Sequence, residues 1–276
     1  MIPELTPYTF GSMSLGRNPI TPEADIRVAR KAMDAGVWFH ASRTYENGFT
    51  FMVLRMAFDQ DRARTPRMIL KIRDGSVPLL RFETEDCLQR LGLETIHIAQ
   101  LVSMVREPGN LVDQLCGPGG PLVDELAALK ERGLIQHAVL FMDKNNSDAV
   151  VEAAEHPLID GVTFYFNALQ RDCSDHAWNE IRTRNIPVLA LRTLGGWRDK
   201  RLAEKREALA KAMPDLDPVQ LALDLAASYP EIKTTIGGTA SQPHLEAYLE
   251  AAARSKPLPT ERLSLVEDVR GEADPV

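Results

Sequence analysis

The stretch ETEDCLQRLGLETIHIAQLV, residues 83–102, contains the pattern that decides the fold. Residues 83–92 predict a helix that ends at a glycine, a residue common just past the last helical turn. Residues 95–102 then form a short apolar run with the length expected of a buried strand. A helix followed by a buried strand is one unit of the alternation that builds parallel sheets.

The same alternation extends along the chain in both directions. The predicted strands span residues 8–16, 37–42, 67–73, 95–102, 135–142, 161–168, 186–193 and 233–238. The predicted helices span residues 21–36, 48–61, 83–92, 121–133, 146–156, 174–185, 200–212, 217–229 and 242–255. Eight such strands in 276 residues favour an α/β fold, a single (β/α)8 TIM barrel. A doubly wound open sheet is the alternative, although no GxGxxG follows the first strand.

Composition sets the broad class of the protein. No linker-like shift interrupts the chain, so we expect one barrel domain over residues 1–270 and a loose C-terminal tail over residues 271–276. The net charge of −7 disfavours nucleic acid as a partner, because phosphate binding needs a basic face. No signal peptide and no run of ~18 apolar residues is visible, so we expect a cytoplasmic protein with no membrane contact. The sequence indicates no oligomeric state.

The reacting groups of such barrels lie where the strands end, at their C-terminal side. Polar residues and glycines near the predicted strand ends are therefore the candidates for a site that binds a small molecule. The cysteines Cys87, Cys116 and Cys173 form no CxxC, and no HxH or HExxH occurs. We therefore expect reduced thiols and no metal site.

Several segments, in the same order, resemble the aldo-keto reductase superfamily. Residues 87–101, CLQRLGLETIHIAQL, are similar to its SLxRLGxDYIDLYQLH segment, and residues 35–48, AGVWFHASRTYENG, to its GINFFDTAxxYG segment. Residues 186–196, IPVLALRTLGG, resemble its IPVxAYSPLGG segment. The resemblance implies a barrel of the aldo-keto reductase type. It also implies an oxidoreductase that reduces carbonyl compounds with a nicotinamide dinucleotide, NADP or NAD.

The resemblance also implies catalytic residues, because the family uses an Asp–Tyr–Lys–His tetrad. Tyr45 matches the tyrosine that donates the proton, and Lys71 matches the lysine that lowers its pKa. His40 stands at the position of the aspartate, and Val102 at that of the substrate-orienting histidine. We therefore take Tyr45, Lys71 and His40 as the catalytic candidates, with Val102 shaping the pocket.

The residues that hold the nicotinamide in the family are replaced in this chain. The positions that clamp its carboxamide read Phe141, Met142 and Thr163, and the stacking tyrosine aligns with Leu191. The remaining expected contacts for a dinucleotide are main-chain groups near a helix N-terminus, which can bind a phosphate. The candidate cofactor-binding residues are Leu194, Gly195, Gly196, Gly237 and Gly238.

Two features near the predicted site each have two possible interpretations. His40 can accept a hydrogen bond from Lys71 or Tyr45 and act as a base, or it can be a packed, hydrogen-bonded histidine. Arg43 and Arg192 can form an anion pocket, or they can be solvated or paired with a neighbour. The candidate substrate-pocket residues are Trp38, Arg43, Val102, Asn167 and Arg192.

Three functions compete at this stage. The first is NAD(P)H-dependent reduction of a small aldehyde or ketone at an atypical site, with Tyr45 as proton donor assisted by Lys71. The second is a non-redox enzyme, a lyase or isomerase, in which His40, Tyr45 and Lys71 move protons without a nicotinamide. The third is a catalytically silent binding subunit. The changes at the clamp positions separate the first function from the other two.

Overall fold

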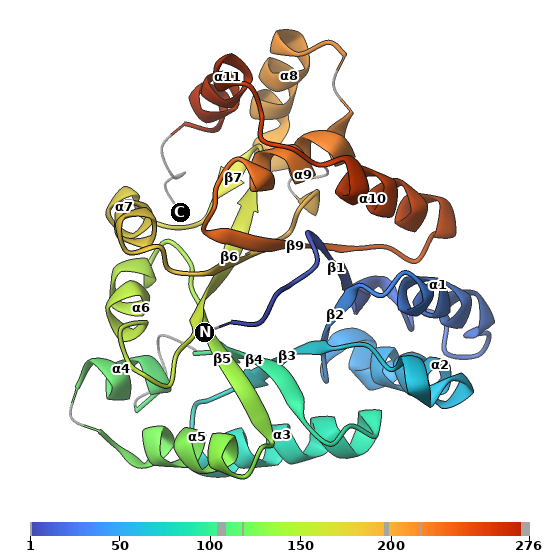
Figure 1. Ribbon diagram of the computed structural model, residues 1–276, viewed down its shortest axis with the longest axis vertical. Helices are drawn as coiled ribbons and strands as arrows, with labels where there is room; N and C mark the ends of the chain where they lie inside the picture. The colour runs from blue at the N-terminus through green and yellow to red at the C-terminus, as the bar shows by residue number, and fades with distance from the viewer. Residues whose placement is uncertain (1, 104–108, 118, 196–198, 216, 272–276) are drawn as a thin grey trace.

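The barrel is built from eight parallel strands. The structure, a computed structural model, describes residues 2–103, 109–117, 119–195, 199–215 and 217–271. The strands are β1 (Tyr8–Gly11), β2 (Trp38–Ser42), β3 (Met68–Arg73), β4 (Ile96–Val102), β5 (Ile135–Phe141), β6 (Gly161–Asn167), β8 (Val188–Leu191) and β9 (Ile232–Gly238). They pair in the order β5-β4-β3-β2-β1-β9-β8-β6, and β5 pairs with β6 to close the ring (Figure 1). The predicted (β/α)8 barrel is confirmed.

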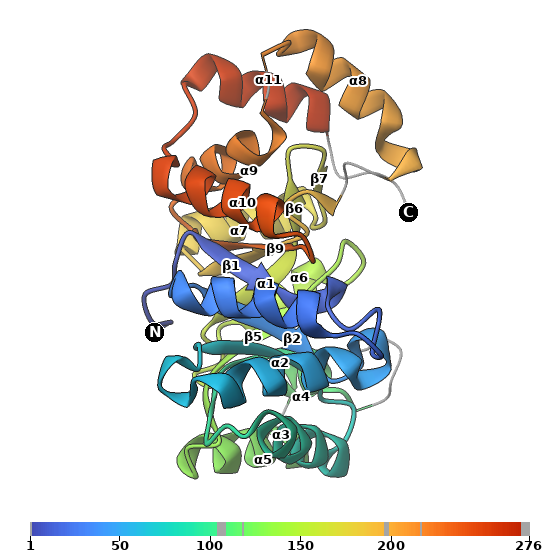
Figure 2. The ribbon, with the colours of Figure 1, turned by 90° about the vertical axis from the view of Figure 1, so that its right-hand side faces the viewer.

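Helices surround this ring and connect successive strands. They are α1 (Glu23–Asp34), α2 (Phe49–Gln60), α3 (Val77–Leu91), α4 (Leu111–Cys116), α5 (Pro121–Glu131), α6 (Ser147–Ala153), α7 (Asp175–Arg184), α8 (Ala203–Ala212), α9 (Pro218–Ala227), α10 (Gln242–Arg254) and α11 (Thr260–Arg270). Figure 2 shows α8 and α11 packed on each other at one edge of the molecule. None of the helices in the described part of the chain is long and apolar enough to cross a membrane.

Three short or irregular elements are absent from the sequence prediction. Helix α4 has six residues, and strand β7 (Gln170–Arg171) has two and pairs antiparallel with β6. Both are shorter than the window over which a hydrophobic period can be read. Helix α11 buries only Val266 and Arg270, so its sequence shows no clear apolar face.

Helix α3 begins earlier than its apolar pattern predicts, at Val77 instead of residue 83. The Ser76 hydroxyl accepts a hydrogen bond from the Leu79 amide, and Pro78 lies in the first turn, so capping chemistry sets the start. Gly92 ends the helix with φ 63°, a left-handed conformation that glycine adopts without steric cost. The predicted C-terminal end is therefore correct.

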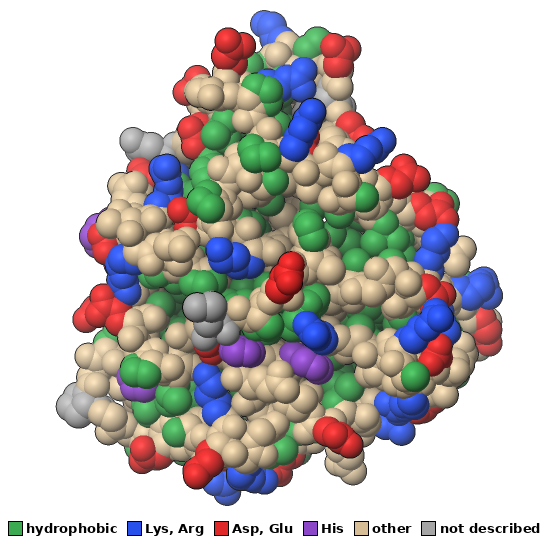
Figure 3. Space-filling view, in the orientation of Figure 1, with side chains coloured by type: hydrophobic (Ala, Val, Ile, Leu, Met, Phe, Trp, Pro, Cys, Tyr) green, Lys and Arg blue, Asp and Glu red, His purple; other side chains and the backbone are tan. Residues whose placement is uncertain are grey.

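A small apolar cluster fills the inside of the barrel, separate from the larger core between strands and helices. It consists of Trp38, Ile69, Ile98, Val139, Leu189, Leu191 and Ile236. Ile2 and Leu5 pack against this cluster, and the N-terminal segment crosses the centre of the ring in Figure 1. That end of the barrel is its floor. Figure 3 shows the floor from outside, with acidic and basic side chains interspersed.

Candidate functional site

The loop after β2 carries Tyr45 to the open end of the barrel. Residues 45–48 form one turn of 3-10 helix, within which Glu46 has φ 47° and Asn47 φ 55°, and Gly48 follows with φ 90°. Asn-Gly is a pair that tolerates this left-handed conformation. The Gly48 carbonyl accepts a hydrogen bond of 3.0 Å from Arg90 on α3, which ties the loop to the barrel wall.

Tyr45, Lys71 and His40 lie together, as the sequence predicts for a shared site. The Lys71 Nζ atom lies 5.4 Å from the centroid of the Tyr45 ring. The His40 and Tyr45 ring centroids are 6.2 Å apart. Tyr45 and Lys71 are partly exposed, whereas His40 is buried. Within the described residues, neither the Tyr45 hydroxyl nor the Lys71 amine has a hydrogen-bond partner, so both are available to a ligand.

The His40 ring is fixed by Gln100 on β4. His40 Nε2 lies 2.6 Å from Gln100 Oε1, and because an amide oxygen only accepts, the ring nitrogen donates. Burial and the positive charge of Lys71 lower the pKa of His40 to about 3, although the bond to Gln100 opposes the shift. His40 is therefore neutral at physiological pH, and it supplies no negative charge to Lys71.

Burial also shifts the pKa values of the other two catalytic candidates, Lys71 and Tyr45. Burial lowers the pKa of Lys71, and no carboxylate among the described residues contributes to raise it again. Burial, followed by the neighbouring Tyr165, raises the pKa of Tyr45 well above its usual range. A reductase of the family's type needs the opposite, since its lysine has to make the tyrosine a better acid. Tyr45, Lys71 and His40 therefore lie together, but their pKa shifts differ from those that the family resemblance implies.

Tyr165 is a site residue that the sequence analysis does not single out. Its ring packs edge-on against Phe141 at 6.0 Å, and the Arg192 guanidinium lies 5.2 Å from its centroid. The neighbouring Tyr165 also contributes to the raised pKa of Tyr45. Strand alternation could have predicted Tyr165 as a site residue, because residues 163, 165 and 167 share one face of β6, where Thr163 aligns with a nicotinamide-clamp position and Asn167 is a substrate-pocket candidate.

Arg192 and Asn167 meet at the rim of the barrel. Arg192 follows β8 with φ 64°, and the Asn167 side-chain amide donates to its carbonyl at 3.2 Å. The Arg192 guanidinium lies 3.5 Å from the Asp199 carboxylate, which Arg201 also contacts. Arg192 is thus paired, and Asn167 holds the backbone of the turn.

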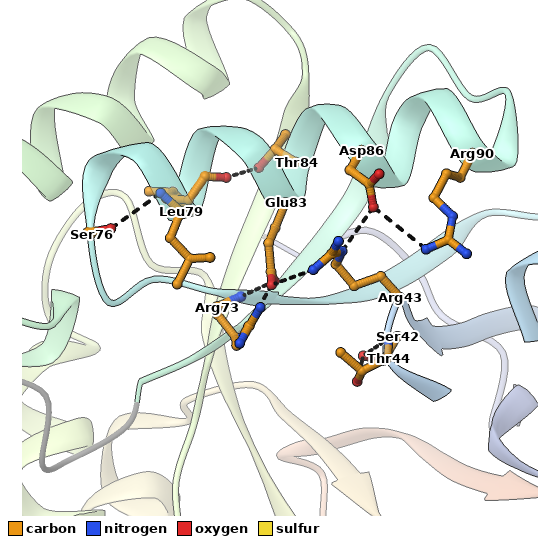
Figure 4. A network of polar contacts seen from close by, with 11 residues as sticks. Ser42, Arg43, Thr44, Arg73, Ser76, Leu79, Glu83, Thr84, Asp86 and Arg90 are labelled. Atoms are coloured by element: carbon orange, nitrogen blue, oxygen red, sulfur yellow. Dashed lines mark hydrogen bonds and ion pairs between the residues drawn. The ribbon is translucent and has the colours of Figure 1, made fainter. Parts of the chain in front are cut away.

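Arg43 points away from the catalytic candidates, into a network on α3. Its Nε lies 2.9 Å from Asp86, and its Nη1 lies 3.4 Å from Glu83, which is buried and also bonds Arg73 (Figure 4). The structure therefore does not bring Arg43 and Arg192 together as an anion pocket. Pairing with a neighbour was the other interpretation, and the partners are these carboxylates.

Trp38 and Val102 lie at opposite ends of the barrel. Trp38 is the first residue of β2 and lines a cavity of about 600 Å³ on the floor, together with Leu5 and Arg67. The structure therefore places Trp38 inside the barrel but away from Tyr45 and Lys71. Val102 is the last residue of β4, is partly exposed and faces the open end, next to Arg73 of β3.

The positions that would clamp a nicotinamide carboxamide do not fit that group through their side chains. The Thr163 hydroxyl already donates to the Leu189 carbonyl at 2.8 Å, and Met142 is fully buried in the outer core. Leu191 belongs to the apolar cluster inside the barrel, and Phe141 packs against that cluster. A carboxamide at this wall would meet rings and aliphatic groups in place of hydrogen-bond donors.

The glycine-rich segments have structural reasons of their own. A Cβ atom on Gly238 would lie 2.6 Å from the Gly11 carbonyl oxygen, and one on Gly237 would lie 3.0 Å from the Tyr248 ring. Gly195 lies beneath the Arg192 side chain, close to Leu194. Gly196 lies outside the described residues. The close approach of β1 and β9 therefore requires a glycine at position 238, and the Tyr248 ring on α10 limits position 237 to a small residue, whether or not a phosphate binds.

Comparison with known proteins supports the fold. No family model and no curated protein matches the sequence. An aldo-keto reductase from Bacillus halodurans in its holo form is 17% identical, with a TM-score of 0.76 over 96% of this chain and 92% of that one. An aldo/keto reductase from Klebsiella pneumoniae in complex with NADP and acetate is 16% identical, with a TM-score of 0.76 over 99% of this chain and 96% of that one.

A further structure from Klebsiella pneumoniae, in complex with NADPH, is 16% identical, with a TM-score of 0.76 over 99% of this chain and 100% of that one. The chain therefore has the fold of the aldo-keto reductases along nearly its full length. At this level of identity the likeness defines the fold, and the chemistry has to be argued from the residues of the site.

Proposed function

We propose that this protein reduces a small aldehyde or ketone with NADPH or NADH, slowly, at an atypical site at the open end of the barrel. One observation carries the proposal: the Lys71 amine lies 5.4 Å from the Tyr45 ring at the C-terminal ends of the strands. In this role the Tyr45 hydroxyl gives its proton to the carbonyl oxygen, and Lys71 stabilises the phenolate that results.

The cofactor, when bound, supplies the hydride. The dinucleotide would be held by main-chain groups instead of a side-chain clamp. These groups belong to the segment around Leu194 and Gly195 and to Gly238, shortly before α10. Helix α10 begins at Gln242 with no side-chain cap at Ser241, so its first amides can receive a phosphate. The solved relatives in complex with NADP and NADPH support this choice of cofactor.

Low activity follows from the electrostatics of the site. The raised pKa of Tyr45 weakens it as an acid, and burial, which lowers the pKa of Lys71, disfavours the charged amine that would stabilise a phenolate. Val102 offers no hydrogen bond to a carbonyl oxygen, so the substrate is held by shape. The Phe141 and Tyr165 rings form an apolar wall, which favours small substrates with little charge.

Isothermal titration calorimetry with NADPH and NADH tests the cofactor half of the proposal. We expect saturable binding with a micromolar Kd for at least one of them. The control is α-NADPH, which carries the same phosphates with the nicotinamide in the wrong orientation, so equal binding would indicate recognition of the adenosine end alone. Absence of heat with either natural cofactor up to millimolar concentration would exclude the reductase.

A second candidate function is favoured by the neutral His40. A buried imidazole beside an amine and a phenol can move protons at one substrate carbon, as a lyase or isomerase requires. Its test is exchange of substrate C–H for deuterium in D2O without cofactor, followed by NMR. Exchange in the wild type that His40→Phe removes would support this function, and absence of exchange would leave the reductase.

A further inference from the structure

Lys71 has surroundings unlike those of the other lysines in the described chain. Lys130 pairs with Asp160 at 3.0 Å, and Lys233 donates to the Pro230 carbonyl at 2.7 Å. Lys211 is exposed on α8. Lys71 instead projects from the inner side of β3 into the open end of the barrel, and no carboxylate in the described residues pairs with it.

The groups around Lys71 favour a neutral amine that solvent can still reach. Its neighbours are the face of the Tyr45 ring and the neutral His40, whose Nε2 proton is already held by Gln100. Lys71 and Tyr45 are partly exposed, so a small molecule entering at the strand ends can touch both. A desolvated lysine without a counterion is the state in which an amine acts as a nucleophile.

We propose that Lys71 captures small aldehydes and ketones as a covalent imine at the open end of the barrel. This capture needs neither a nicotinamide nor either activity proposed above. The ligand class follows from the Phe141 and Tyr165 rings, which pack on each other and, through Tyr165, neighbour Tyr45, and these rings favour a short, uncharged carbonyl compound. The imine is an entry to carbon–carbon or proton-transfer chemistry next to the captured carbon.

The step balances without an oxidant or a reductant. The Nζ lone pair forms a bond to the carbonyl carbon while the π electrons move to the oxygen, which takes up a proton. The nitrogen loses one proton to give a neutral carbinolamine. The carbinolamine hydroxyl takes up a second proton and leaves as water, the nitrogen loses its remaining proton, and a C=N bond remains, so the two protons gained by oxygen equal the two lost by nitrogen. The Tyr45 hydroxyl is the adjacent group that can pass a proton to the departing oxygen and regain one from the nitrogen, so it is protonated before and after the step.

Reductive trapping tests the proposal. The purified protein is incubated with butanal or glycolaldehyde at pH 7 without nicotinamide, reduced with sodium cyanoborohydride, and digested for peptide mass mapping. We expect one adduct per chain, at Lys71, forming severalfold faster than at the exposed Lys211, because burial without a counterion lowers the pKa of Lys71 and leaves more of its amine neutral. Modification spread evenly over the exposed lysines would overturn the proposal, and so would absence of any adduct.

Matched variants locate the nucleophile. Lys211→Met should keep the fast adduct, whereas Lys71→Met should lose it. Lys71→Arg, which keeps the charge, should lose it too, and circular dichroism confirms that each variant is folded. A fast adduct that survives in folded Lys71→Arg would overturn the assignment. Because cofactor is absent throughout, failure of NADPH binding and failure of imine capture are separate results.

Discussion

His40 on β2 and Gln100 on β4 are joined across β3 by a hydrogen bond of 2.6 Å, with Lys71 on the strand between them. The bond fixes the His40 ring as a donor in the interior of the barrel, and burial together with the charge of Lys71 keeps that ring neutral. It explains how a histidine is accommodated at the position that the sequence resemblance aligns with an aspartate: Gln100 satisfies its buried nitrogen. The same exchange removes the negative charge beside Lys71.

Replacing Gln100 by leucine should lower the free energy of unfolding by about 1–2 kcal/mol, since the buried His40 Nε2–H loses its acceptor. The loss stays in the lower part of the usual range because Gln100 Nε2, itself buried and unpartnered, is removed as well. Urea unfolding measures it. Gln89→Leu, on the exposed side of α3, is the matched control and should change stability by less than about 0.5 kcal/mol. Equal effects of the two substitutions would contradict the role of the hydrogen bond.

His40→Asp should restore a negative charge next to Lys71 and raise the rate of carbonyl reduction. The carboxylate raises the pKa of Lys71, which then stabilises the Tyr45 phenolate more strongly. The unpartnered Gln100 Nε2 is available as a donor to the new carboxylate. We expect an increase in kcat of about tenfold or more, within the range that one acid–base group contributes.

The control for that experiment is His40→Asn, which has the same size without the charge. It should leave the rate of NADPH oxidation near that of the wild type. If the aspartate and asparagine variants have the same rate, the charge beside Lys71 does not limit the reaction. The same pair of variants bears on imine capture, because only the aspartate should slow trapping at Lys71.

Gly238→Ala should destabilise the protein by about 1–3 kcal/mol in the absence of any cofactor, since the added methyl group meets backbone that cannot move freely. Its Cβ would lie 2.6 Å from the Gly11 carbonyl oxygen. Gly119→Ala is the control, because nothing lies within 4 Å of its Cβ. Thermal unfolding without ligand measures both variants. An unchanged melting temperature for Gly238→Ala would argue that the glycine serves a ligand and not the strand pairing.

Asp160 should make the protein sensitive to acid. Burial alone would raise its pKa, but the bonds from Lys130 and the Ala138 amide outweigh burial and lower the pKa to about 2. The folded-state pKa lies below the unfolded value of about 3.9, so the contribution is complete above that value and is lost as pH falls toward 2. It amounts to about 2 kcal/mol.

Free energies of unfolding measured from pH 6 to pH 2.5 check this expectation. The difference between wild type and Asp160→Asn should shrink as the pH falls below 4. The exposed Asp215→Asn is the control and should follow the wild-type curve. A constant difference between wild type and Asp160→Asn over the whole pH range would be inconsistent with the lowered pKa.

The fold was predictable from the sequence because each strand–helix unit is indicated by a short, contiguous stretch of residues. The apolar run of β4 and the glycine that ends α3 both have the expected positions. The start of α3 was not predictable from hydrophobic periodicity, since a serine cap and a proline set it. Helix α11 has too few buried residues for its period to be read.

The candidate site was predictable only in part. Strand register brings His40, Lys71 and Gln100 onto adjacent strands, and the resemblance to a known family located the first two. The direction of a long side chain is a matter of tertiary contacts, which is why Arg43 points toward Glu83 and Asp86 instead of the site. Trp38 was misplaced for a different reason. It is the first residue of β2 and lies at the floor, whereas the last residues of the strand lie at the open end.

In the proposed reduction, Tyr45 is the group that gives a proton to the substrate. The decisive measurement is the rate of NADPH and NADH oxidation with a panel of small aldehydes and ketones, for wild type, Tyr45→Phe and Tyr248→Phe. Tyr248 is buried outside the barrel against Tyr8 and serves as the matched control. We predict slow turnover that falls by about a hundredfold in Tyr45→Phe and is unchanged in Tyr248→Phe. Turnover that persists in Tyr45→Phe at the wild-type rate would contradict the account.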